Sequence, residues 1–294
     1  MSNFSTKLNT IAKNIDTYLK NFLIQQNRSS DLIKPMKYGI FSGGKRFRSA
    51  ILINTGKIFG VDYKKLIIVG AAIECIHSYS LIHDDLPSMD NDDMRRNKPS
   101  MHKKFNEFTA ILAGNSLLTL AFEILSGKDL KLPQNTKVEL IRTLANCSGH
   151  SGLAGGQYSD LTFDNKKISK NAVINMLKKK TGKLFGFCCE SVGIIKGKNL
   201  KEKDSLRKIG LQIGLLYQIT DDLIDYRDDY IMFGKSNKGD KEKGKVTIVS
   251  LLGEDKSLNF AQKIKKKLDE KIKKYGNKAN DLLESVEFML KRKF

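Results

Sequence analysis

Apolar residues recur along this chain at the three- and four-residue spacing of amphipathic helices, whereas alternating strand patterns are nearly absent. In the segment AQKIKKKLDEKIKKY, for example, Ile264, Leu268 and Ile272 share one helical face and lysines cover the other. No internal repeat or long linker interrupts the series, which predicts one all-α domain over residues 1–294. The predicted helices span residues 3–25, 35–57, 64–86, 107–126, 134–149, 170–195, 203–226, 245–275 with a break near Gly253, and 277–292.

Glycine and proline mark the expected interruptions of this pattern. Pairs of glycines at 43–44 and 155–156 predict turns, and the segment GKSNKGDKEKG at 234–244 predicts an exposed, mobile loop. A helical pattern starts, bends or stops at each of the four prolines, Pro35, Pro87, Pro99 and Pro133.

The composition is that of a folded protein with a strongly basic surface. The 294 residues are 40% apolar, enough for a sizeable core, and the formal net charge is +20. Only nine of the 52 basic residues are Arg, which leaves 43 Lys, and many of these lie along polar helical faces. A lysine-rich surface is the plain interpretation, although nucleic acid, acidic lipid and anionic substrates would all suit this charge.

The sequence carries no sign of membrane or secretory targeting. The N-terminal MSNFSTKLNTIAKNIDTYLK lacks the apolar core of a signal peptide, and no segment approaches the roughly 18 apolar residues of a membrane span. We therefore expect a cytoplasmic protein without a membrane span. The cysteines show no metal-ligand spacing and lie in apolar patterns, which predicts core thiols at Cys75, Cys147, Cys188 and Cys189.

Two clusters of aspartates each follow a largely apolar stretch that is predicted to be helical. The cluster in QITDDLID places four oxygen-bearing side chains at i, i+3, i+4 and i+7, on one helical face: Gln218, Asp221, Asp222 and Asp225. Carboxylates crowded beside apolar surface require a cation. An exposed acidic turn is the alternative, which the preceding apolar run IGLLYQIT disfavours.

The other cluster lies in LIHDDLPSMD and contains Asp84, Asp85 and Asp90. His77 precedes Asp84 by two helical turns, and Pro87 should bend the chain so that Asp90 returns toward Asp84. Oxygen ligands without matching Cys or His favour magnesium, which takes further oxygens from water and substrate phosphates. We expect two such cation sites that face each other. His77 alone would be an ordinary core histidine, but beside these aspartates we expect it to contact a ligand.

Basic residues gather at glycine turns and beside the aspartates. The segment GGKRFR at 43–48 leads into a helix and predicts an anion cradle with Lys45 and Arg48 as donors. Metals and many cations in one site predict a substrate with more than one diphosphate. The remaining basic candidates are Arg95 and Arg96 after the first aspartates, Lys180 before Thr181 in a KTG turn, and Lys235 and Lys245 around the glycine-rich loop.

With these motifs the chain resembles the short-chain trans-prenyl diphosphate synthases, and specifically the bacterial type of farnesyl diphosphate synthase. The matching motifs cover about residues 40–250 in the family's order: GGKRFR, CIHSYSLIHDDLPSMDNDDMRRNKPSMHKKF, LAGGQYSDL, KKKTGKLF, YQITDDLID, GK and GKVT. The resemblance implies an all-α homodimeric enzyme with about ten or more helices around a deep central cavity. It also implies condensation of isopentenyl diphosphate with dimethylallyl and geranyl diphosphate, and three Mg²⁺ ions per active site, for which Mn²⁺ could substitute.

The resemblance also implies a role for each matching residue. Magnesium would be bound directly by Asp84, Asp90 and Asp221, and directly or through water by Asp85, Asp222 and Asp225. The allylic diphosphate would be held by Arg95, Lys180, Lys235 and Lys245. The pocket for isopentenyl diphosphate would contain Gly44, Lys45, Arg48, His77 and Arg96. The allylic cation would be stabilised by the Lys180 carbonyl, Thr181 and Gln218.

Two residues on the helix before the first aspartates should set the product length. Helix geometry places Ser80 one turn before Asp84 and Tyr79 beside it, so both should line the wall or floor of the tail pocket. An aromatic residue five positions before the first aspartate, with a two-residue expansion inside the motif, is similar to the farnesyl-making pattern of the family. We therefore expect a fifteen-carbon product. A geranyl or geranylgeranyl diphosphate synthase remains the alternative, as does ordinary core packing for Tyr79.

Two other classes of protein share some of these features. A terpene cyclase would have a helical cavity and an aspartate motif, but it normally pairs that motif with an Asn/Ser/Glu metal site and lacks a second diphosphate pocket. A basic helical protein that binds nucleic acid would account for the net charge of +20 but not for six aspartates in apolar helices. We therefore expect no specific nucleic-acid partner.

Overall fold

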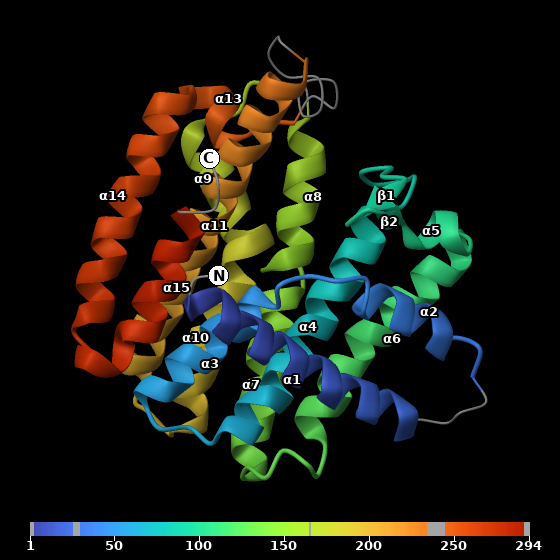
Figure 1. Ribbon diagram of the computed structural model, residues 1–294, viewed down its shortest axis with the longest axis vertical. Coiled ribbons are helices and arrows are strands. Elements are labelled where there is room, and N and C mark those ends of the chain that lie inside the picture. The colour runs from blue at the N-terminus through green and yellow to red at the C-terminus, as the bar shows by residue number, and fades with distance from the viewer. Residues whose placement is uncertain (1–2, 26–29, 165, 234–244, 291–294) are drawn as a thin grey trace. The chain divides into compact units, whose positions relative to one another are not determined.

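The computed structural model describes residues 3–25, 30–164, 166–233 and 245–290. Within these residues the chain is helical apart from short connections and one hairpin of two-residue strands, so the predicted all-α class is confirmed (Figure 1). The predicted loop at 234–244, with Lys235, lies outside the described residues. All four cysteines are buried, as predicted.

The chain divides into two compact units. One comprises residues 1–56 and 60–141, and the other comprises residues 57–59 and 142–294. A single domain and a central cavity would both depend on how the two units are arranged. Neither unit by itself tests that arrangement, so both remain predictions.

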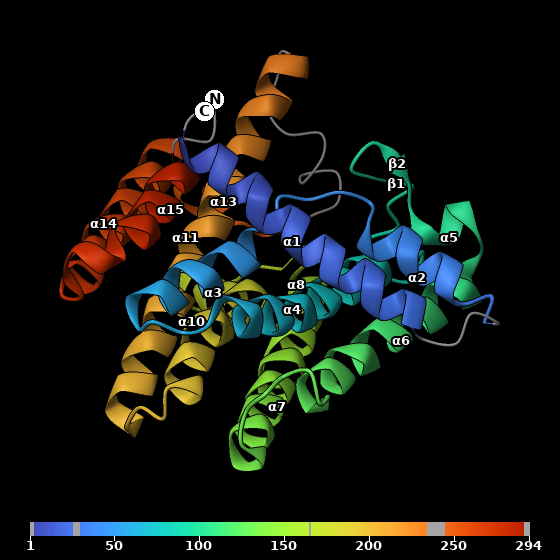
Figure 2. The ribbon, with the colours of Figure 1, turned by 60° about the horizontal axis from the view of Figure 1, so that its bottom comes forward.

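The first unit is built around α4 (Tyr63–Asp84), whose flanks are covered by α1 (Asn3–Gln25) and α6 (Glu107–Ser126). Figures 1 and 2 show α1 lying across α4. The remaining elements are α2 (Ile33–Ile40), α3 (Phe47–Ile58), β1 (Met94–Arg95), β2 (Lys98–Pro99), α5 (Met101–Lys104) and α7 (Gln134–Ser148). The boundary to the second unit falls within α7, and the last two residues of α3 also belong to the second unit.

α4 is apolar around its whole circumference, which is the pattern of a core helix. Asp62 begins it, because the Asp62 carboxylate accepts a hydrogen bond from the backbone N–H of Lys65 at 3.1 Å. A close approach fixes α4 against α6, since a Cβ at Gly114 would lie 2.2 Å from Nε2 of His83. The C-terminal end of α4 is thereby held in place.

Two helices, α4 and α6, are long and apolar enough to cross a membrane. The sequence-based statement that no segment approaches that composition is therefore wrong. In α4, 83% of the apolar window is buried, as in the core helix of a soluble protein, whereas in α6 only 44% is buried. Length and composition alone are weak evidence for a span.

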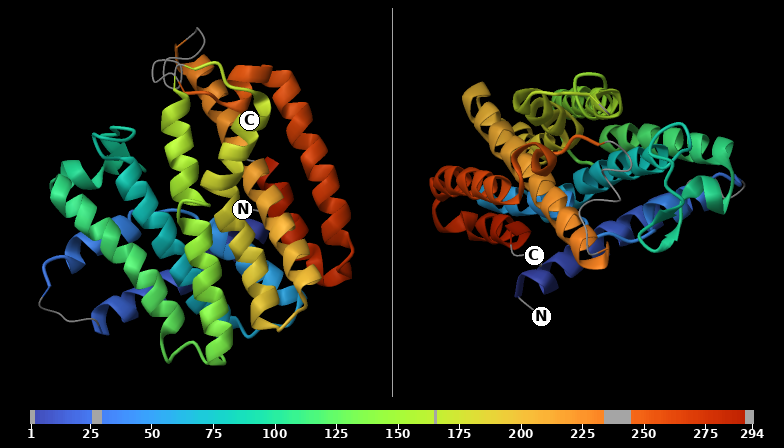
Figure 3. Two further views of the ribbon diagram at one scale, coloured as in Figure 1. Left: turned by 180° about the vertical axis from the view of Figure 1, so that it is seen from behind. Right: turned by 90° about the horizontal axis from the view of Figure 1, so that it is seen from above.

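The second unit is centred on α10 (Lys183–Ile195) and the long α11 (Leu200–Phe233). Its other elements are α8 (Leu153–Phe163), α9 (Lys170–Leu177), the π-helical turn η1 (Lys178–Gly182), α13 (Ile248–Leu252), α14 (Glu254–Lys273), the 3₁₀ turn η2 (Gly276–Ala279) and α15 (Asn280–Leu290). Figure 3 shows α14 and α15 as an antiparallel pair.

Glycines let α11 approach the η1–α10 segment at backbone distance. A Cβ at Gly214 would lie 2.7 Å from the Cα of Gly182, and a Cβ at Gly210 would lie 2.2 Å from the carbonyl oxygen of Phe185. Because Gly210, Gly214 and Gln218 follow one another at four-residue intervals, this seam leads directly to Gln218.

The short segment at residues 57–59 belongs to the second unit through two contacts with its C-terminal part. Nζ of Lys57 lies 2.6 Å from Oδ2 of Asp281, and the ring of Phe59 meets the ring of Tyr275 edge-on with centroids 5.5 Å apart. The second unit is therefore assembled from two separate stretches of the chain.

Some predicted boundaries were wrong. The helix predicted at 35–57 is broken into α2 and α3 by the glycine turn at 43–44. The turn predicted at 155–156 is a helix instead, because Gly155 and Gly156 lie inside α8, where the missing Cβ atoms permit close packing. α11 runs further at both ends than the predicted 203–226.

Candidate active site

The first aspartate cluster lies where α4 ends. Asp84 is the last residue of the helix, and Pro87 follows two residues after Asp85. The backbone N–H of Asp90 then donates to the carbonyl oxygen of Asp84 at 2.8 Å. The chain therefore turns back and brings Asp90 beside Asp84.

Arg95 is held at this cluster by carboxylates. Its guanidinium donates to the buried carboxylate of Asp85 and reaches Asp92 at 3.2 Å. Burial raises the pKa of Asp85, against the opposing hydrogen bond and charge of Arg95. Burial alone would lower the pKa of Arg95, but the hydrogen bond and charge of Asp85 outweigh it and raise that pKa. Arg95 therefore stays charged.

Positive charges surround His77, two turns before Asp84. Its pKa is lowered well below the ordinary value of 6.5, first by burial and then by the charges of Arg48, Arg96, Arg46 and Arg95. The imidazole is therefore neutral at pH 7 and can act as a hydrogen-bond donor or acceptor rather than as a cation.

The GGKRFR turn is clamped by Arg96. Gly43 and Gly44 have φ of 108° and 116°, a region that favours glycine, and the Arg96 guanidinium donates to the carbonyl oxygen of Gly43. A Cβ at Gly44 would lie 2.6 Å from Nη1 of Arg96, so a side chain there would have to displace this guanidinium. Lys45 is exposed beside this turn, and Arg48 is half-buried. The basic turn and the first aspartate motif thus lie together in the first unit.

Tyr79 and Ser80, the predicted chain-length residues, are both buried on α4. The Tyr79 ring stands edge-on to the ring of His83, with centroids 5.7 Å apart, and the Ser80 hydroxyl donates to the carbonyl oxygen of His77 at 2.9 Å. Burial and the nearby Asp84 charge raise the pKa of Tyr79 to about 12. Their role in setting product length stays a prediction.

In the second unit, a chain of hydrogen bonds joins η1 to the second aspartate motif. The Thr181 hydroxyl donates to Oε1 of Gln218 at 3.0 Å, and Nε2 of Gln218 donates to Oδ1 of Asp222 at 3.0 Å. Asp222 is buried, Asp221 is half-buried and Asp225 is exposed. The order Thr181, Gln218, Asp222 fixes which end of the Gln218 amide faces each neighbour.

The π-helical turn places Lys180 and Thr181. The backbone N–H of Lys183 bonds to the carbonyl oxygen of Lys178, five residues earlier, and the turn packs against Gly156 of α8. A Cβ at Gly156 would lie 2.1 Å from the backbone nitrogen of Lys180, so a larger residue there would displace the turn.

Two residues of the LAGGQYSDL motif belong to this arrangement, although the sequence analysis gave them no role. Oδ2 of Asp160 lies 2.6 Å from Nζ of Lys180 and orients that ammonium. Gln157 is buried, yet neither of its amide atoms has a hydrogen-bond partner among the described residues. Buried amides nearly always have one, so Gln157 is a further candidate for ligand contact. In the sequence, the only sign of a role for Gln157 and Asp160 is their three-residue spacing, which places them on one helical face.

Of the lysines around the glycine-rich loop, only Lys245 is described; it precedes α13 and is half-buried. Thr247 of the GKVT motif caps α13 by accepting from the backbone N–H of Ser250 at 3.0 Å. Lys235 lies outside the described residues.

The donor chemistry of both aspartate clusters fits magnesium. All the predicted ligands are carboxylate oxygens, and two of the clustered residues, Asp84 and Asp90, meet at one turn. Among the described residues, no group of three or more His, Cys, Asp or Glu side chains forms a closed metal site. Water and substrate phosphates would have to supply the other oxygens, as they commonly do for Mg²⁺.

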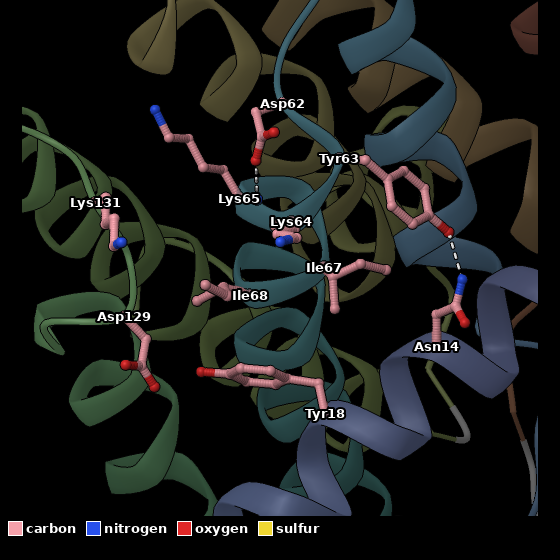
Figure 4. Close-up of a pocket in the computed structure, with 10 residues that line it drawn as sticks. All are labelled: Asn14, Tyr18, Asp62, Tyr63, Lys64, Lys65, Ile67, Ile68, Asp129 and Lys131. Carbon is pink, nitrogen blue, oxygen red and sulfur yellow. Dashed lines mark hydrogen bonds between the residues drawn. The ribbon is translucent and has the colours of Figure 1, made fainter.

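A separate cavity of about 540 Å³ lies at the other end of α4 (Figure 4). Part of its lining is formed by Tyr18 of α1, by Ile67 and Ile68 of α4, and by Asp129 and Lys131 of the connection between α6 and α7. None of the predicted site residues borders this cavity. It is distinct from the aspartate motif of α4.

Comparison with known proteins agrees with this site. Residues 29–289 match the model of the polyprenyl synthetase family. The farnesyl diphosphate synthase of Escherichia coli is 38% identical over 253 residues, 85% of each chain. An FPP/GFPP synthase from Zymomonas mobilis superposes with a TM-score of 0.87 at 36% identity, over 98% of this chain and 99% of that one. A Helicobacter pylori geranyltransferase solved with magnesium and isoprenyl diphosphate has a TM-score of 0.82 at 30% identity, over 99% and 97%.

The chain therefore belongs to the polyprenyl synthetase family. The predictions of this family, of an all-α fold and of a prenyltransferase of the farnesyl diphosphate synthase type are confirmed.

Proposed function

We propose that this protein condenses isopentenyl diphosphate head to tail with dimethylallyl and geranyl diphosphate and releases farnesyl diphosphate and diphosphate. The observation that carries this proposal is the meeting of the GGKRFR turn and the first aspartate motif, which Arg95 and Arg96 join. Basic groups that bind anions and carboxylates that bind cations thereby lie side by side, which suits diphosphate substrates.

In this proposal the reaction begins when the allylic carbon–oxygen bond ionises. Arg95, Lys180, Lys235 and Lys245 bind the departing diphosphate and stabilise its growing negative charge. Asp84, Asp90 and Asp221, with Asp85, Asp222 and Asp225 in support, would hold magnesium, which would supply further charge stabilisation when bound. Both aspartate motifs serve this step. The family's expected three ions per site, with Mn²⁺ as a substitute, are part of the proposal.

The groups around η1 then act on the allylic cation. Because the Thr181 hydroxyl donates a hydrogen bond to Oε1 of Gln218, the lone pairs of the Thr181 oxygen remain available to the cation. The carbonyl of Lys180 offers a second oxygen, and Asp160 keeps the Lys180 ammonium oriented. The double bond of isopentenyl diphosphate, held by Gly44, Lys45, Arg48, His77 and Arg96, attacks the cation, and released diphosphate takes the final proton.

We further propose a homodimer. α6 exposes an apolar stripe in which Phe108, Ile111 and Leu112 are 66%, 43% and 49% exposed. These residues lie on neighbouring turns of a helix as apolar as the buried α4. A contiguous exposed apolar stripe is typical of a protein interface, and a second copy of this chain is the proposed occupant.

The cellular setting belongs to the same proposal. We propose a cytoplasmic enzyme in which α4 and α6 are core and interface helices rather than membrane spans. The net charge of +20 serves anionic substrates and solubility, without a specific nucleic-acid partner.

The proposal is tested by incubating purified protein with dimethylallyl diphosphate, excess isopentenyl diphosphate and magnesium, and identifying the products by mass after phosphatase treatment. We expect farnesol. Geraniol or geranylgeraniol would keep the condensation but correct the product length, and no magnesium-dependent product would refute the proposed activity.

Asp84→Ala and Asp221→Ala each should lower kcat by orders of magnitude, because each removes a carboxylate that holds magnesium at the leaving group. Circular dichroism should show an unchanged helical content. Asp204→Ala, which removes a carboxylate at a surface pair with Arg207, is the matched control and should leave the rate near that of the wild type. Near-normal rates in either motif variant would overturn the metal assignment.

A further inference from the structure

Arg46, in the middle of the GGKRFR turn, has a conformation that its residue type disfavours. Its φ is 49°, in the left-handed region where glycine is the ordinary occupant, and Gly43 and Gly44 just before it also have positive φ. A large side chain persists in such a conformation only where its surroundings hold it. The side chain itself is therefore needed at this position.

The surroundings that hold Arg46 come from three helices of the first unit. Its guanidinium is buried and donates to Oδ1 of Asp16 on α1 at 2.9 Å and to the carbonyl oxygen of Ile40 at the end of α2. It also reaches Oε2 of Glu74 on α4 at 3.5 Å. A planar guanidinium can make these bonds in several directions at once, whereas an ammonium cannot match that geometry.

Glu74 is buried and fixes the turn a second time. Its other oxygen, Oε1, accepts from the Ser49 hydroxyl at 2.7 Å and from the Ser49 backbone N–H at 3.3 Å. One carboxylate therefore holds Arg46, which follows Lys45, and Ser49, which follows Arg48. Both expected diphosphate donors lie next to a residue that Glu74 anchors.

Glu74 also lies one helical turn before His77 on α4. The Arg46–Glu74 pair thus sets the position of the basic turn relative to the helix that carries His77 and the first aspartates. Neither residue is available to a diphosphate itself, since Arg46 is 4% exposed and Glu74 is 2% exposed.

We propose that Arg46 and Glu74 are positioning residues for isopentenyl diphosphate: they act through Lys45, Arg48 and His77 without touching the substrate. This inference rests on the proposed function and adds to it one buried ion pair, Arg46 and Glu74. We expect the Arg46–Glu74 pair to affect the binding of isopentenyl diphosphate and not that of the allylic diphosphate. The reason is that the pair contacts the GGKRFR turn and not η1.

The test compares steady-state kinetics of Arg46→Lys and Glu74→Gln with the wild type, varying each substrate in turn. We expect the KM for isopentenyl diphosphate to rise by about tenfold or more, the scale of a lost charge-assisted hydrogen bond. The KM for geranyl diphosphate and kcat at saturating isopentenyl diphosphate should stay within about threefold, because an interaction made equally in ground and transition states changes KM alone.

Two further variants distinguish positioning from general support of the fold. Arg46→Gly suits the positive φ and removes the guanidinium, so millimolar guanidinium chloride should partly restore its KM for isopentenyl diphosphate. Ser49→Ala removes only the hydroxyl bond to Glu74 and should give a smaller rise in the same KM. Arg207→Lys, at a surface pair with Asp204, is the matched conservative control and should change neither KM.

The outcomes separate this inference from the proposed function. A wild-type protein that forms no condensation product would refute the proposed function. If the wild type is active, the positioning role is refuted by an unchanged KM for isopentenyl diphosphate, by an equal rise in both KM values, or by a lower melting temperature with unchanged KM values.

Discussion

Tyr79 combines a large ring with a buried position on α4, five residues before Asp84. Its ring packs edge-on against His83, and its hydroxyl has a pKa of about 12 because of burial and the Asp84 charge. The phenol is therefore neutral at every physiological pH. The predicted contribution of Tyr79 to product length is therefore one of volume and not of charge.

Tyr79→Ala should therefore lengthen the product beyond fifteen carbons, because the smaller side chain leaves room for another isoprene unit. Mass analysis of the dephosphorylated products measures this directly. Tyr79→Phe keeps the ring and is the control, for which the wild-type product is expected. A Tyr79→Ala enzyme with unchanged products would leave Tyr79 as core packing.

Glycines show why single residues are hard to interpret from sequence. Gly43 and Gly44 were predicted to form a turn and do so with positive φ, while Gly155 and Gly156 received the same prediction and lie inside α8. The first pair uses the freedom of the glycine backbone, and Gly156 uses the absence of a side chain against Lys180. Both roles are filled by glycine, so the sequence alone does not distinguish them. The packing partner does, and for Gly156 this partner is distant in sequence.

At the scale of elements, the hydrophobic pattern predicted most helices because their apolar stripes are what they bury. The helices predicted at 3–25 and 107–126 coincide with α1 and α6. The hydrophobic pattern could not predict η1. A π turn differs from an α turn only in the carbonyl oxygen to which each backbone N–H donates its hydrogen bond. The pattern also could not show that Lys180 pairs with Asp160, because that contact depends on how α8 and η1 meet.

The glycine seam between α11 and η1 makes the position of Gln218 sensitive to one methyl group. Gly214→Ala would place a Cβ 2.7 Å from the backbone of Gly182 and should separate the two segments, at a cost of about 1–3 kcal/mol of stability. The Thr181–Gln218 hydrogen bond should lengthen with it. We expect a lower melting temperature and a kcat reduced by at least about tenfold at a temperature where the variant is folded.

Gly186→Ala is the matched control in the same seam. A Cβ there would meet Leu211 and Arg207 at 3.4 and 3.5 Å, which is ordinary van der Waals contact. Wild-type kcat is expected, with unchanged or slightly higher stability because alanine favours helix more than glycine. Equal losses in both variants would show that the seam does not set the Gln218 geometry.

At the scale of the whole molecule, α6 is the element whose composition and exposure disagree. Its sequence is that of a core helix, yet only 44% of its apolar window is buried. In the dimer proposed above, this exposure is removed by a second copy.

Leu112→Asp should convert the protein to monomers, because it places a charge in the proposed apolar interface. Light scattering coupled to size-exclusion chromatography measures the mass directly. Leu200→Asp makes the same change at a residue that is 82% exposed on α11 and should leave the dimer intact. A wild-type protein that elutes as a monomer at micromolar concentration would refute the dimer.

The contacts of residues 57–59 have a consequence for how this chain folds. Lys57 and Asp281 are 224 positions apart, so their pairing closes a very large loop. During synthesis, Lys57 and Phe59 leave the ribosome long before Asp281 and Tyr275 exist. A cut near residue 141 does not yield the two units as separate fragments, since the N-terminal fragment keeps Lys57 and Phe59 without their partners. Completion of the second unit is therefore a late event, after the C-terminal helix has emerged.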